Sequence, residues 1–371
     1  MRKILLPYLS AGHGHLVLAQ AIAHYILLER PDWEIRIMDA ARELQDDLMK
    51  KTFEDTWRVF LGMPAFLSRF LFFMERLFPR IVLAFNRRSF RTAVPKAAAF
   101  LDEYRPDLVM STHWACTHLF SMARGSRDIP LYYIYGELGA TYSLINCGAD
   151  VYFTLTPRIE KGLSRIGIER TRMQRIPLVV HPHILENGVP KEEFKRRLGI
   201  PASNLAVVLS LGGEGIGHSM RFIDAFVRDV RNASLVVLTG RNHELLLRVR
   251  KKFRGAKNVV GLGFLDDISS VIAAADVLAG KTGTGYAMMA IKKGLPLIVT
   301  HIGAPNEREN MRFVVESGYG WYCPTPRRFV RRVKLMARDR ASSRDVMDRL
   351  EAVDPQNGAR TIAAAIVERL G

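Results

Sequence analysis

Short apolar runs alternate with helical stretches along nearly the whole chain, and this alternation occurs twice. In the first half, the runs that predict strands span residues 3–9, 34–38, 107–111, 131–135 and 151–155. In the second half they span residues 206–211, 234–239, 259–262, 277–279 and 295–300. Strands separated by helices build parallel sheets that are covered by those helices. We therefore expect an α/β fold with two Rossmann-like domains.

A proline-rich break separates the two halves. Residues 176–201 contain Pro177, Pro182, Pro190 and Pro201, together with the turn signal Asn187-Gly188. We expect an N-terminal domain of residues 1–178 and a C-terminal domain of residues 179–371. If two such domains face one another, a cleft lies between the carboxyl ends of their strands, where ligands bind in open α/β sheets.

The charge balance is strongly basic. Lys and Arg number 54 against 37 acidic residues, which gives a formal net charge of +17. Such an excess favours anionic partners, namely nucleic acid, an anionic lipid surface or phosphorylated small molecules. The three cysteines, Cys116, Cys147 and Cys323, form no CxxC pair. We expect a reducing compartment, no disulfide framework and no zinc ribbon. We also expect neither a signal peptide nor a transmembrane helix.

Residues 50–91 interrupt the alternation. This segment mixes many Phe, Leu and Met residues with nine Lys and Arg residues, against three acidic ones. Apolar and basic residues at helical spacing are typical of a helix that lies in a membrane interface. The alternative is a pair of core helices with solvated arginines. A second basic run, residues 327–349, either extends the same membrane face or forms an ordinary solvated helix.

Three glycine-rich turns lie where a strand becomes a helix. They fall at residues 12–15, 209–219 and 279–296. A helix N-terminus offers free N–H groups, and glycine lets an anionic ligand come close. The second and third turns could clasp a diphosphate from two sides. In the first turn Val17 breaks the dinucleotide pattern GxGxxG, and Asp39 could imitate its ribose carboxylate, so NAD binding is a minor alternative.

The ordered set of motifs resembles the family of monogalactosyldiacylglycerol synthases and processive diacylglycerol glucosyltransferases. More distantly, it resembles the lipid-linked N-acetylglucosaminyltransferase of peptidoglycan synthesis. His15 falls on the histidine of the family's glycine-rich opening, and "YRPDLVMSTH" is similar to its "KPD…S.H" strand. The other matching stretches are residues 211–217 (family GGGEGMG), 281–296 (KAGPGTIAEA…GLP), 305–310 (GQEEGN) and 316–320 (ENGVG).

The resemblance implies a GT-B fold and the transfer of a hexose from a UDP-sugar to a membrane lipid such as diacylglycerol. It further implies inversion at the sugar carbon, no metal, and no cofactor besides the UDP-sugar co-substrate. The expected partners are the UDP-sugar, the lipid acceptor and an anionic membrane surface, but not nucleic acid. The expected location is peripheral, on the cytoplasmic face of the cell membrane.

Residues on three strand ends are the candidates for chemistry on the acceptor. His15 is the expected base, because an imidazole beside a helix start stays neutral near pH 7. His13 is the alternative base, and it replaces a family glycine. Glu137, where the family has an aspartate, could orient or replace the base. Gly14 and His113 are expected to line the acceptor side.

The candidates for donor binding lie in the second half. Backbone N–H groups of the two glycine turns should hold the leaving diphosphate, and the turn after residue 262 should read uracil through its backbone. Asn306 and Glu307 should bind sugar hydroxyls, and Asn310 should brace their turn. The full donor set is Gly212, Gly213, Glu214, Gly263, Phe264, Leu265, Lys281, Thr282, Gly283, Thr284, Gly285, Asn306, Glu307 and Asn310.

One departure from the family bears on the donor. The family glutamate that holds the nucleotide ribose falls on Met289, which cannot accept hydroxyl hydrogen bonds as a carboxylate does. Glu307 or a backbone group could take over, the donor could differ, or activity could be weak. A catalytically weak homologue that binds a nucleotide or an anionic lipid is therefore the alternative function.

Two further alternatives concern metal and nucleic acid. The pairs His13/His15 and His181/His183 could bind a metal, but no neighbouring Cys or carboxylate completes a tetrahedral site, and no DxD pair suits Mg²⁺. A nucleic-acid binder is motivated by the net charge alone, since the aromatic residues cluster with aliphatic ones.

Overall fold

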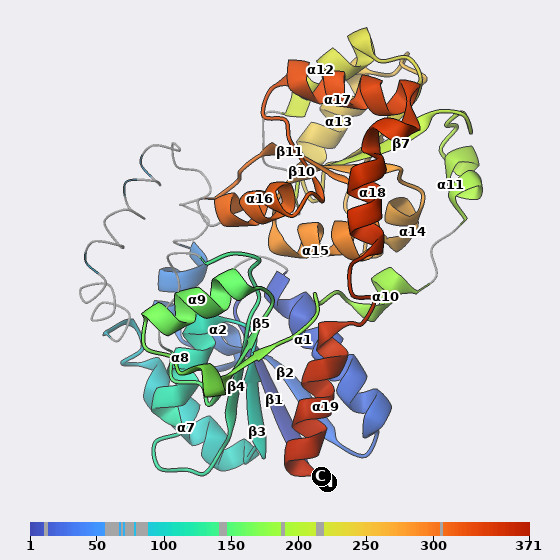
Figure 1. Ribbon diagram of the computed structural model, residues 1–371. Coiled ribbons are helices and arrows are strands. Elements are labelled where there is room, and N and C mark those ends of the chain that lie inside the picture. Colours follow the sequence, from blue (N-terminus) through green and yellow to red (C-terminus); the bar gives the residue numbers. More distant parts are fainter. Residues whose placement is uncertain are drawn as a thin grey trace. The chain divides into compact units, whose positions relative to one another are not determined.

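The computed structural model describes residues 1–10, 14–55, 67, 70, 78, 88–140, 147–186, 190–212, 219–304 and 307–371. Within this part, the chain divides into two compact units (Figure 1). Unit 1 is built mainly from Met1–His181 and Gln356–Gly371, and unit 2 mainly from Pro182–Gly303 and Glu307–Pro355. The expected membrane segment, residues 50–91, lies largely outside the described residues.

Unit 1 contains a parallel sheet in the order β2-β1-β3-β4-β5-β6. Its central strands are almost wholly buried, as expected of a sheet with helices on both faces. In register, Ile4 of β1 pairs with Ile35 on one side and Leu108 on the other. The strands are β1 (Lys3–Tyr8), β2 (Glu34–Asp39), β3 (Leu108–Ser111), β4 (Leu131–Tyr135), β5 (Val151–Thr154) and β6 (Met173–Arg175).

Helices cover both faces of this sheet. α7 and α8 lie on one face, and α1 and α19 pack together on the other (Figure 1). A π-helical turn at Lys51–Asp55 and a 3₁₀ turn at Arg170–Arg172 complete the described helical segments. The α-helices are α1 (Gly14–Glu29), α2 (Ala40–Glu43), α3 (Asp47–Lys50), α7 (Ala93–Tyr104), α8 (Trp114–Ala123), α9 (Pro157–Arg165) and α19 (Gly358–Leu370).

Unit 2 contains a second parallel sheet, in the order β12-β11-β10-β7-β8-β9. Counted from its own first strand, this is the doubly wound order of dinucleotide-binding domains. The strands are β7 (Leu205–Ser210), β8 (Ala233–Leu238), β9 (Val259–Leu262), β10 (Val277–Lys281), β11 (Leu297–His301) and β12 (Gly320–Tyr322).

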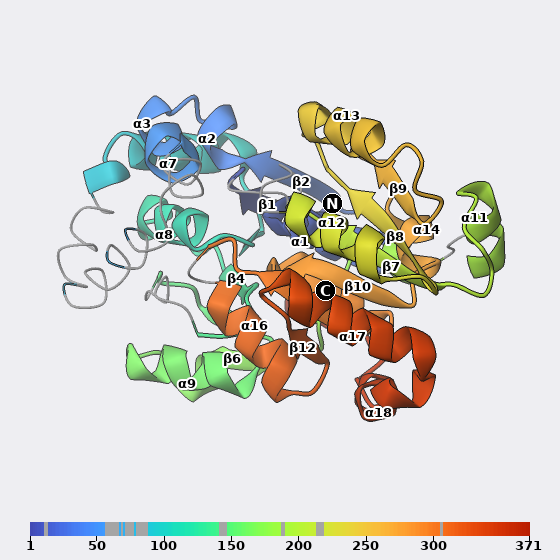
Figure 2. The ribbon, with the colours of Figure 1, turned by 90° about the horizontal axis from the view of Figure 1, so that it is seen from above.

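The helices of unit 2 also divide between two faces. α12 and α17 pack side by side on one face, where Phe222, Phe226 and Phe329 join a common core (Figure 2). α15 and α16 lie on the other face (Figure 1). The helices are α10 (Pro182–Leu185), α11 (Lys191–Arg197), α12 (Ser219–Asp229), α13 (His243–Lys252), α14 (Ser269–Ala273), α15 (Thr284–Lys292), α16 (Glu307–Glu316), α17 (Pro326–Arg338) and α18 (Arg344–Glu351). A 3₁₀ turn at Arg340–Ser343 precedes α18.

The end of the chain departs from the expected division at residue 178/179. Helix α19 belongs to unit 1, although the sequence placed it in the second domain. Its buried stripe, which includes Ile362 and Ile366, packs with α1. Asn357 fixes the start of the helix, because its side-chain amide donates to the Val180 carbonyl at 2.8 Å and its oxygen accepts from the Ala359 N–H at 3.1 Å.

The strand order of each sheet defines a switch point, where the connections leave in opposite directions. In unit 1 the switch point lies between β1 and β3, and in unit 2 between β7 and β10. Ligands bind outside the carboxyl ends of the strands at such points, because loops diverge there and leave helix N-termini accessible. The two switch points are therefore where a site is expected.

Candidate functional site

The unit 1 switch point brings His15 against the loop that follows β3. His15 lies in the first turn of α1 and is half-buried. Its Nδ1 lies 2.6 Å from the Thr112 carbonyl oxygen, and the Thr112 hydroxyl donates to the His15 carbonyl at 3.0 Å. These two bonds connect the start of α1 to the loop after β3, and the first of them fixes the orientation of the imidazole ring.

The carbonyl partner also fixes the tautomer of His15. A carbonyl oxygen can only accept, so Nδ1 carries the proton and Nε2 carries the lone pair. Burial lowers the pKa of His15 below its ordinary value of 6.5, although the hydrogen bond to Thr112 opposes this shift. The imidazole is thus neutral near pH 7 and can accept a proton at Nε2.

His113 supports this arrangement from the next strand end. It is the N-cap of α8, and its Nδ1 accepts the Ala115 N–H at 3.1 Å. Its ring meets that of His15 edge to face, with centroids 4.5 Å apart. Burial, and then the charge of His15, hold the pKa of His113 well below 6.5. Since it is buried and used as a cap, we assign His113 a structural role beside His15.

Glu137 and Gly14 lie at the same edge of the sheet. Glu137 follows β4, the neighbour of β3, and is half-buried. The loop carrying it lies close to α1, because a Cβ at Gly136 would come within 2.7 Å of the Leu18 side chain. Gly14 is exposed, with open space where a side chain would stand. His13 lies outside the described residues.

In unit 2, the described residues of the two glycine turns lie at the switch point. Gly212 follows β7 with φ +77°, and its N–H donates to the Ser210 hydroxyl at 3.3 Å. Gly283 caps the N-terminus of α15, and Gly285 in the first turn is exposed, with open space around it. The N–H groups of this helix start are thus accessible at the same edge as Gly212. Gly213 and Glu214 lie outside the described residues.

Asn310 and Thr282 hold the turn before α15. The Asn310 amide donates to the Thr282 carbonyl at 3.2 Å and to the Thr284 hydroxyl at 2.9 Å. The Thr282 hydroxyl donates to the Glu307 carbonyl at 3.1 Å. All three bonds join the start of α15 to the start of α16, and they fix the direction in which the N–H groups of α15 point.

Glu307 does not present its carboxylate as the sequence led us to expect. One oxygen accepts from the Lys281 ammonium at 2.8 Å, and the other accepts from the Gly303 N–H at 2.7 Å. The residue is only 5% exposed. Its carboxylate is therefore engaged within the protein and is poorly placed to bind sugar hydroxyls or to replace the ribose glutamate. Asn306 lies outside the described residues.

Met289 is likewise an interior residue. It is 5% exposed and lies on the buried face of α15 with Met288. On the same helix, the Tyr286 hydroxyl bridges the two central strands by donating to the carbonyls of Val208 and Ala279, each at 3.2 Å. The helix is anchored by packing and by this phenol, and position 289 contributes apolar contact.

The turn after β9 carries an exposed aromatic ring. Phe264 is 45% exposed, and the Arg241 guanidinium lies over its ring, 4.3 Å from the centroid. Gly263 approaches Leu246 of α13 closely, and Leu265 is half-buried. The sequence pointed to the backbone of residues 263–265 but missed Arg241, which could have been noticed as the basic residue ending the turn after β8.

The metal site and the membrane-spanning helix were also considered at the sequence level. The residues that the structure describes contain no group of three His, Cys, Asp or Glu side chains able to hold a metal ion. His183 lies 3.2 Å from the Asp267 carboxylate. Among the described residues, no helix has the length and apolar character needed to cross a bilayer.

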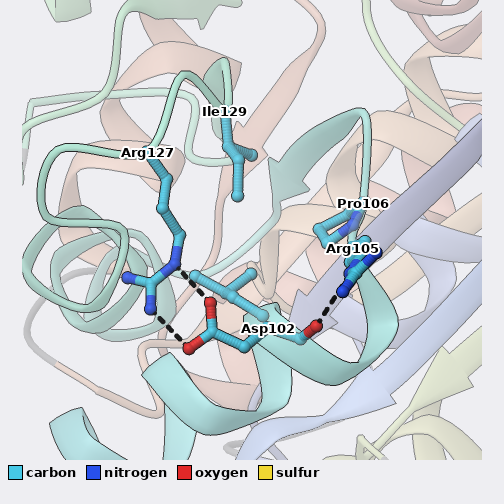
Figure 3. Close-up of a pocket in the computed structure, with 6 residues that line it drawn as sticks. Asp102, Arg105, Pro106, Arg127 and Ile129 are labelled. Atoms are coloured by element: carbon cyan, nitrogen blue, oxygen red, sulfur yellow. Dashed lines mark hydrogen bonds and ion pairs between the residues drawn. The ribbon is translucent and has the colours of Figure 1, made fainter.

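A hollow of about 400 Å³ lies near the amino ends of β3 and β4. Figure 3 shows Arg127 beside Asp102. Two guanidinium nitrogens of Arg127 donate to the two carboxylate oxygens of Asp102, at 2.8 and 2.7 Å. Arg105 and Pro106 precede β3 on the same side. Because His15 and His113 lie at the carboxyl ends of these strands, the hollow is separate from the switch-point site.

The two sheets and their switch points define the GT-B fold class, and solved structures confirm this prediction. The MnaA–UDP co-structure from S. aureus is 14% identical and has a TM-score of 0.64, covering 100% of this chain and 97% of that one. MurG from Acinetobacter baumannii is 13% identical with a TM-score of 0.63, covering 99% and 100%. At these identities the likeness establishes the fold alone.

The chain is also similar in sequence to curated proteins. The chain is 25% identical to the chloroplastic monogalactosyldiacylglycerol synthase of Spinacia oleracea over 288 residues, 72% of this chain and 54% of the relative. It is also 25% identical to a probable monogalactosyldiacylglycerol synthase of Nicotiana tabacum over 350 residues, 88% of this chain and 63% of the relative.

These matches confirm the resemblance that the motifs indicated. The chain spans about half of the spinach protein's length and somewhat more of the tobacco protein's. No protein-family model matches the chain.

Proposed function

We propose that the protein is a glycosyltransferase that moves a hexose from a UDP-sugar to the hydroxyl of a lipid acceptor, with diacylglycerol as the first candidate. Similarity to proteins named monogalactosyldiacylglycerol synthases over most of the chain supports the reaction class. The observation that carries the proposal is the imidazole of His15, which is held neutral at a switch point with its basic nitrogen defined by the Thr112 carbonyl.

Unit 1 would activate the acceptor. Nε2 of His15 takes the proton of the acceptor hydroxyl as its oxygen bonds to the anomeric carbon. The bond from that carbon to the diphosphate breaks in the same step, and UDP leaves with the electron pair. Attack from the face opposite the leaving group inverts the anomeric centre. The proton on His15 then passes to solvent.

Unit 2 would hold the donor. The N–H groups at the start of α15 and around Gly212 can accept the diphosphate, since a helix N-terminus carries a partial positive charge. Phe264 and Arg241 offer a planar surface for the uracil. In this proposal neither a metal nor a separate cofactor takes part, and the UDP-sugar is a co-substrate.

We further propose peripheral attachment to the membrane, on its cytoplasmic face, since the proposed acceptor is a lipid. Helix α17 contributes to this proposal, because its sequence PRRFVRRVKLMAR contains six basic and no acidic residues. Arg328, Arg331 and Arg338 are exposed, and Leu335 beside them is 43% exposed. Basic residues around an exposed apolar side chain suit an anionic lipid surface. Flotation with anionic vesicles at low and high salt tests this attachment.

The decisive test of the function is transfer itself. The intact protein is incubated with each common radiolabelled UDP-sugar and vesicles that contain diacylglycerol and anionic lipid. We expect label in the lipid fraction with at least one donor, and a strong decrease in the His15→Ala variant. If no donor labels any lipid while the protein is folded and vesicle-bound, the proposal is wrong.

A second candidate function is motivated by Met289 and Glu307. Met289 supplies no polar group, and the Glu307 carboxylate is engaged by Lys281 and Gly303. A homologue that binds a nucleotide or an anionic lipid with little turnover fits these two features. Calorimetry that detects UDP binding, combined with no lipid labelling from any donor, would favour this candidate over the transferase.

A further inference from the structure

The end of strand β10 is shaped in an unusual way around Lys281. The register between β10 and β11 shifts there, because Gly280 pairs with Val299 and Lys281 with His301, so β11 carries one extra residue beside the end of β10. Gly280 has φ +142°, and a Cβ there would lie 2.2 Å from the Ser210 carbonyl oxygen of β7. Only glycine fits at this position, so the backbone that leads into Lys281 passes directly against β7.

Two further glycines flank the lysine side chain. A Cβ at Gly212 would lie 2.9 Å from Cε of Lys281, and a Cβ at Gly303 would lie 3.2 Å from Cδ and 3.5 Å from Nζ. Gly212 follows β7 and Gly303 follows β11, the two strands on either side of β10. The side chain of Lys281 thus runs between two backbones that approach it closely because they lack side chains.

Glu307 fixes the end of this side chain. Its Oε1 accepts from the Lys281 ammonium at 2.8 Å, while its Oε2 accepts from the Gly303 N–H at 2.7 Å. The glutamate side chain is 7% exposed and the lysine side chain 29% exposed. The ammonium is therefore held on its inner side by a buried carboxylate, while part of the lysine side chain stays accessible at the sheet edge.

We propose that Lys281 contacts the diphosphate of the donor directly, and that Glu307 is a positioning residue that holds the ammonium in place and does not bind the sugar. This inference rests on the proposed function and assigns roles within the same site. When the bond to the sugar breaks, the diphosphate gains negative charge. A cation already fixed beside the N-terminus of α15 stabilises that charge without having to reorient.

A purely structural ion pair explains the geometry less well. A buried ion pair contributes little net stability, because desolvation offsets its attraction. Here the backbone at residues 212 and 303 leaves room for one lysine side chain, at the strand ends where ligands bind in such sheets. This adaptation is understandable if the direction of the ammonium matters for a ligand.

The test compares UDP with uridine, two probes that differ only in the diphosphate. Binding of each to the intact protein is measured by calorimetry for the wild type, Lys281→Met and Glu307→Gln. We expect Lys281→Met to weaken UDP binding by about tenfold or more, the effect of a lost charge-assisted bond, and to leave uridine binding within about twofold. Glu307→Gln should also weaken UDP binding, but by a smaller factor than Lys281→Met does.

A variant that changes no charge tests the positioning role. Gly303→Ala places a methyl group against both Lys281 and Glu307, so we expect it to weaken UDP binding and again to spare uridine. Where transfer is measured, Glu307→Gln should lower kcat more than it raises KM for the UDP-sugar. Lys252→Met is the matched control, because Lys252 pairs with Asp224 on the surface of the same unit, at 2.6 Å. This control variant should bind both UDP and uridine as the wild type does.

Folding is controlled with the double variant Lys281→Met/Glu307→Gln, which leaves no unpaired buried charge. Its thermal unfolding should be close to that of the wild type, and it should bind UDP as poorly as Lys281→Met. If the folded variants lost affinity for UDP and for uridine by the same factor, the proposed contact between Lys281 and the diphosphate would be wrong. An unchanged kcat with a raised KM for the UDP-sugar in Glu307→Gln would assign Glu307 to the sugar and overturn its positioning role.

The outcomes separate this inference from the proposed function. If the wild type binds UDP through Lys281 but transfers no sugar to any lipid, the function fails and the inference stands. If the wild type transfers sugar and Lys281→Met does so equally well, the function stands and the inference fails. If the folded wild type binds no UDP, both are wrong.

Discussion

His15 shows how a single backbone carbonyl determines which nitrogen of a side chain can act as a base. The Thr112 oxygen accepts from Nδ1 at 2.6 Å and leaves the lone pair on Nε2. The neighbouring His113 ring is itself kept neutral by burial, so it adds no positive charge that would deter a proton. The neutral ring can therefore accept a proton at Nε2, as the proposed function requires.

Replacing His15 should impair transfer while leaving donor binding intact. We expect His15→Ala to lower kcat for lipid labelling by about 10²–10⁴-fold, the range for losing a general base. UDP binding should be unchanged, because the proposed donor contacts lie in unit 2. Initial rates and calorimetry on the same preparation measure both quantities. His24→Ala, further along α1, is the control, and a normal rate in His15→Ala would exclude this role.

The pH dependence of transfer follows from the pKa of the same residue. The base must be neutral, and burial lowers its pKa below 6.5. Activity should therefore decline only when the pH falls below 6.5. The pH range of full activity should extend to lower pH than it would with a histidine of ordinary pKa. A profile of kcat/KM between about pH 5 and 8 tests this. An acidic limb centred above 6.5 would contradict it.

At the scale of elements, the start of helix α8 depends on His113. A histidine is an unusual N-cap, but its Nδ1 accepts the Ala115 N–H as an Asn or Asp oxygen would. The adjoining Ser111 hydroxyl donates to the His113 carbonyl at 2.9 Å, which fixes the turn between β3 and α8. The cap and the contact with His15 therefore use the same imidazole.

Two substitutions separate these two uses. His113→Ala should lower the free energy of unfolding by about 1 kcal/mol through the lost cap, whereas His113→Asn should restore most of it. Both remove the ring beside His15 and should reduce transfer to a similar extent. Urea unfolding and initial rates give the two readouts. Equal stability of the Ala and Asn variants would show that the cap contributes nothing.

The elements also show what the sequence could and could not predict. The alternating apolar runs predicted the central strands closely, because buried parallel strands are continuous apolar stretches. Strands β6 and β12 were missed, since three residues carry no periodicity. The three glycine-rich stretches lie between a strand and a helix as expected, but the register shift beside Lys281 was missed, because it depends on how β10 pairs with β11.

The partners of the candidate site residues were harder to predict than the residues themselves. The sequence named His15, Lys281 and Glu307. It could not show that His15 bonds a carbonyl 97 residues away, or that Glu307 pairs with a lysine 26 residues before it. These partners depend on which strand ends the fold brings together, and for Glu307 they show an ion pair where the sequence led us to expect a carboxylate open to a ligand.

At the scale of the whole molecule, the two ends of the chain are joined within unit 1. The Arg2 side chain donates to the Leu370 carbonyl at 3.2 Å, and α19 packs along α1, the helix that begins at Gly14 and carries His15. A Cβ at Gly358 would lie 2.1 Å from the Pro177 carbonyl oxygen, so the chain re-enters unit 1 by a close backbone approach. The last helix is thus part of the support of the His15 site, although it follows the whole of unit 2.

This arrangement predicts that a change in the last helix weakens the first unit. Ile366 is fully buried on α19, and Ile366→Ala should cost about 2–5 kcal/mol through a cavity. Amide hydrogen exchange should quicken in β1 and β3, while β7 and β8 stay protected. Ile223→Ala, a fully buried position in the core of unit 2, should give the reverse pattern. If Ile366→Ala instead quickened amide exchange in β7 and β8 alone, α19 would be stabilising unit 2. That result would contradict the assignment of α19 to unit 1.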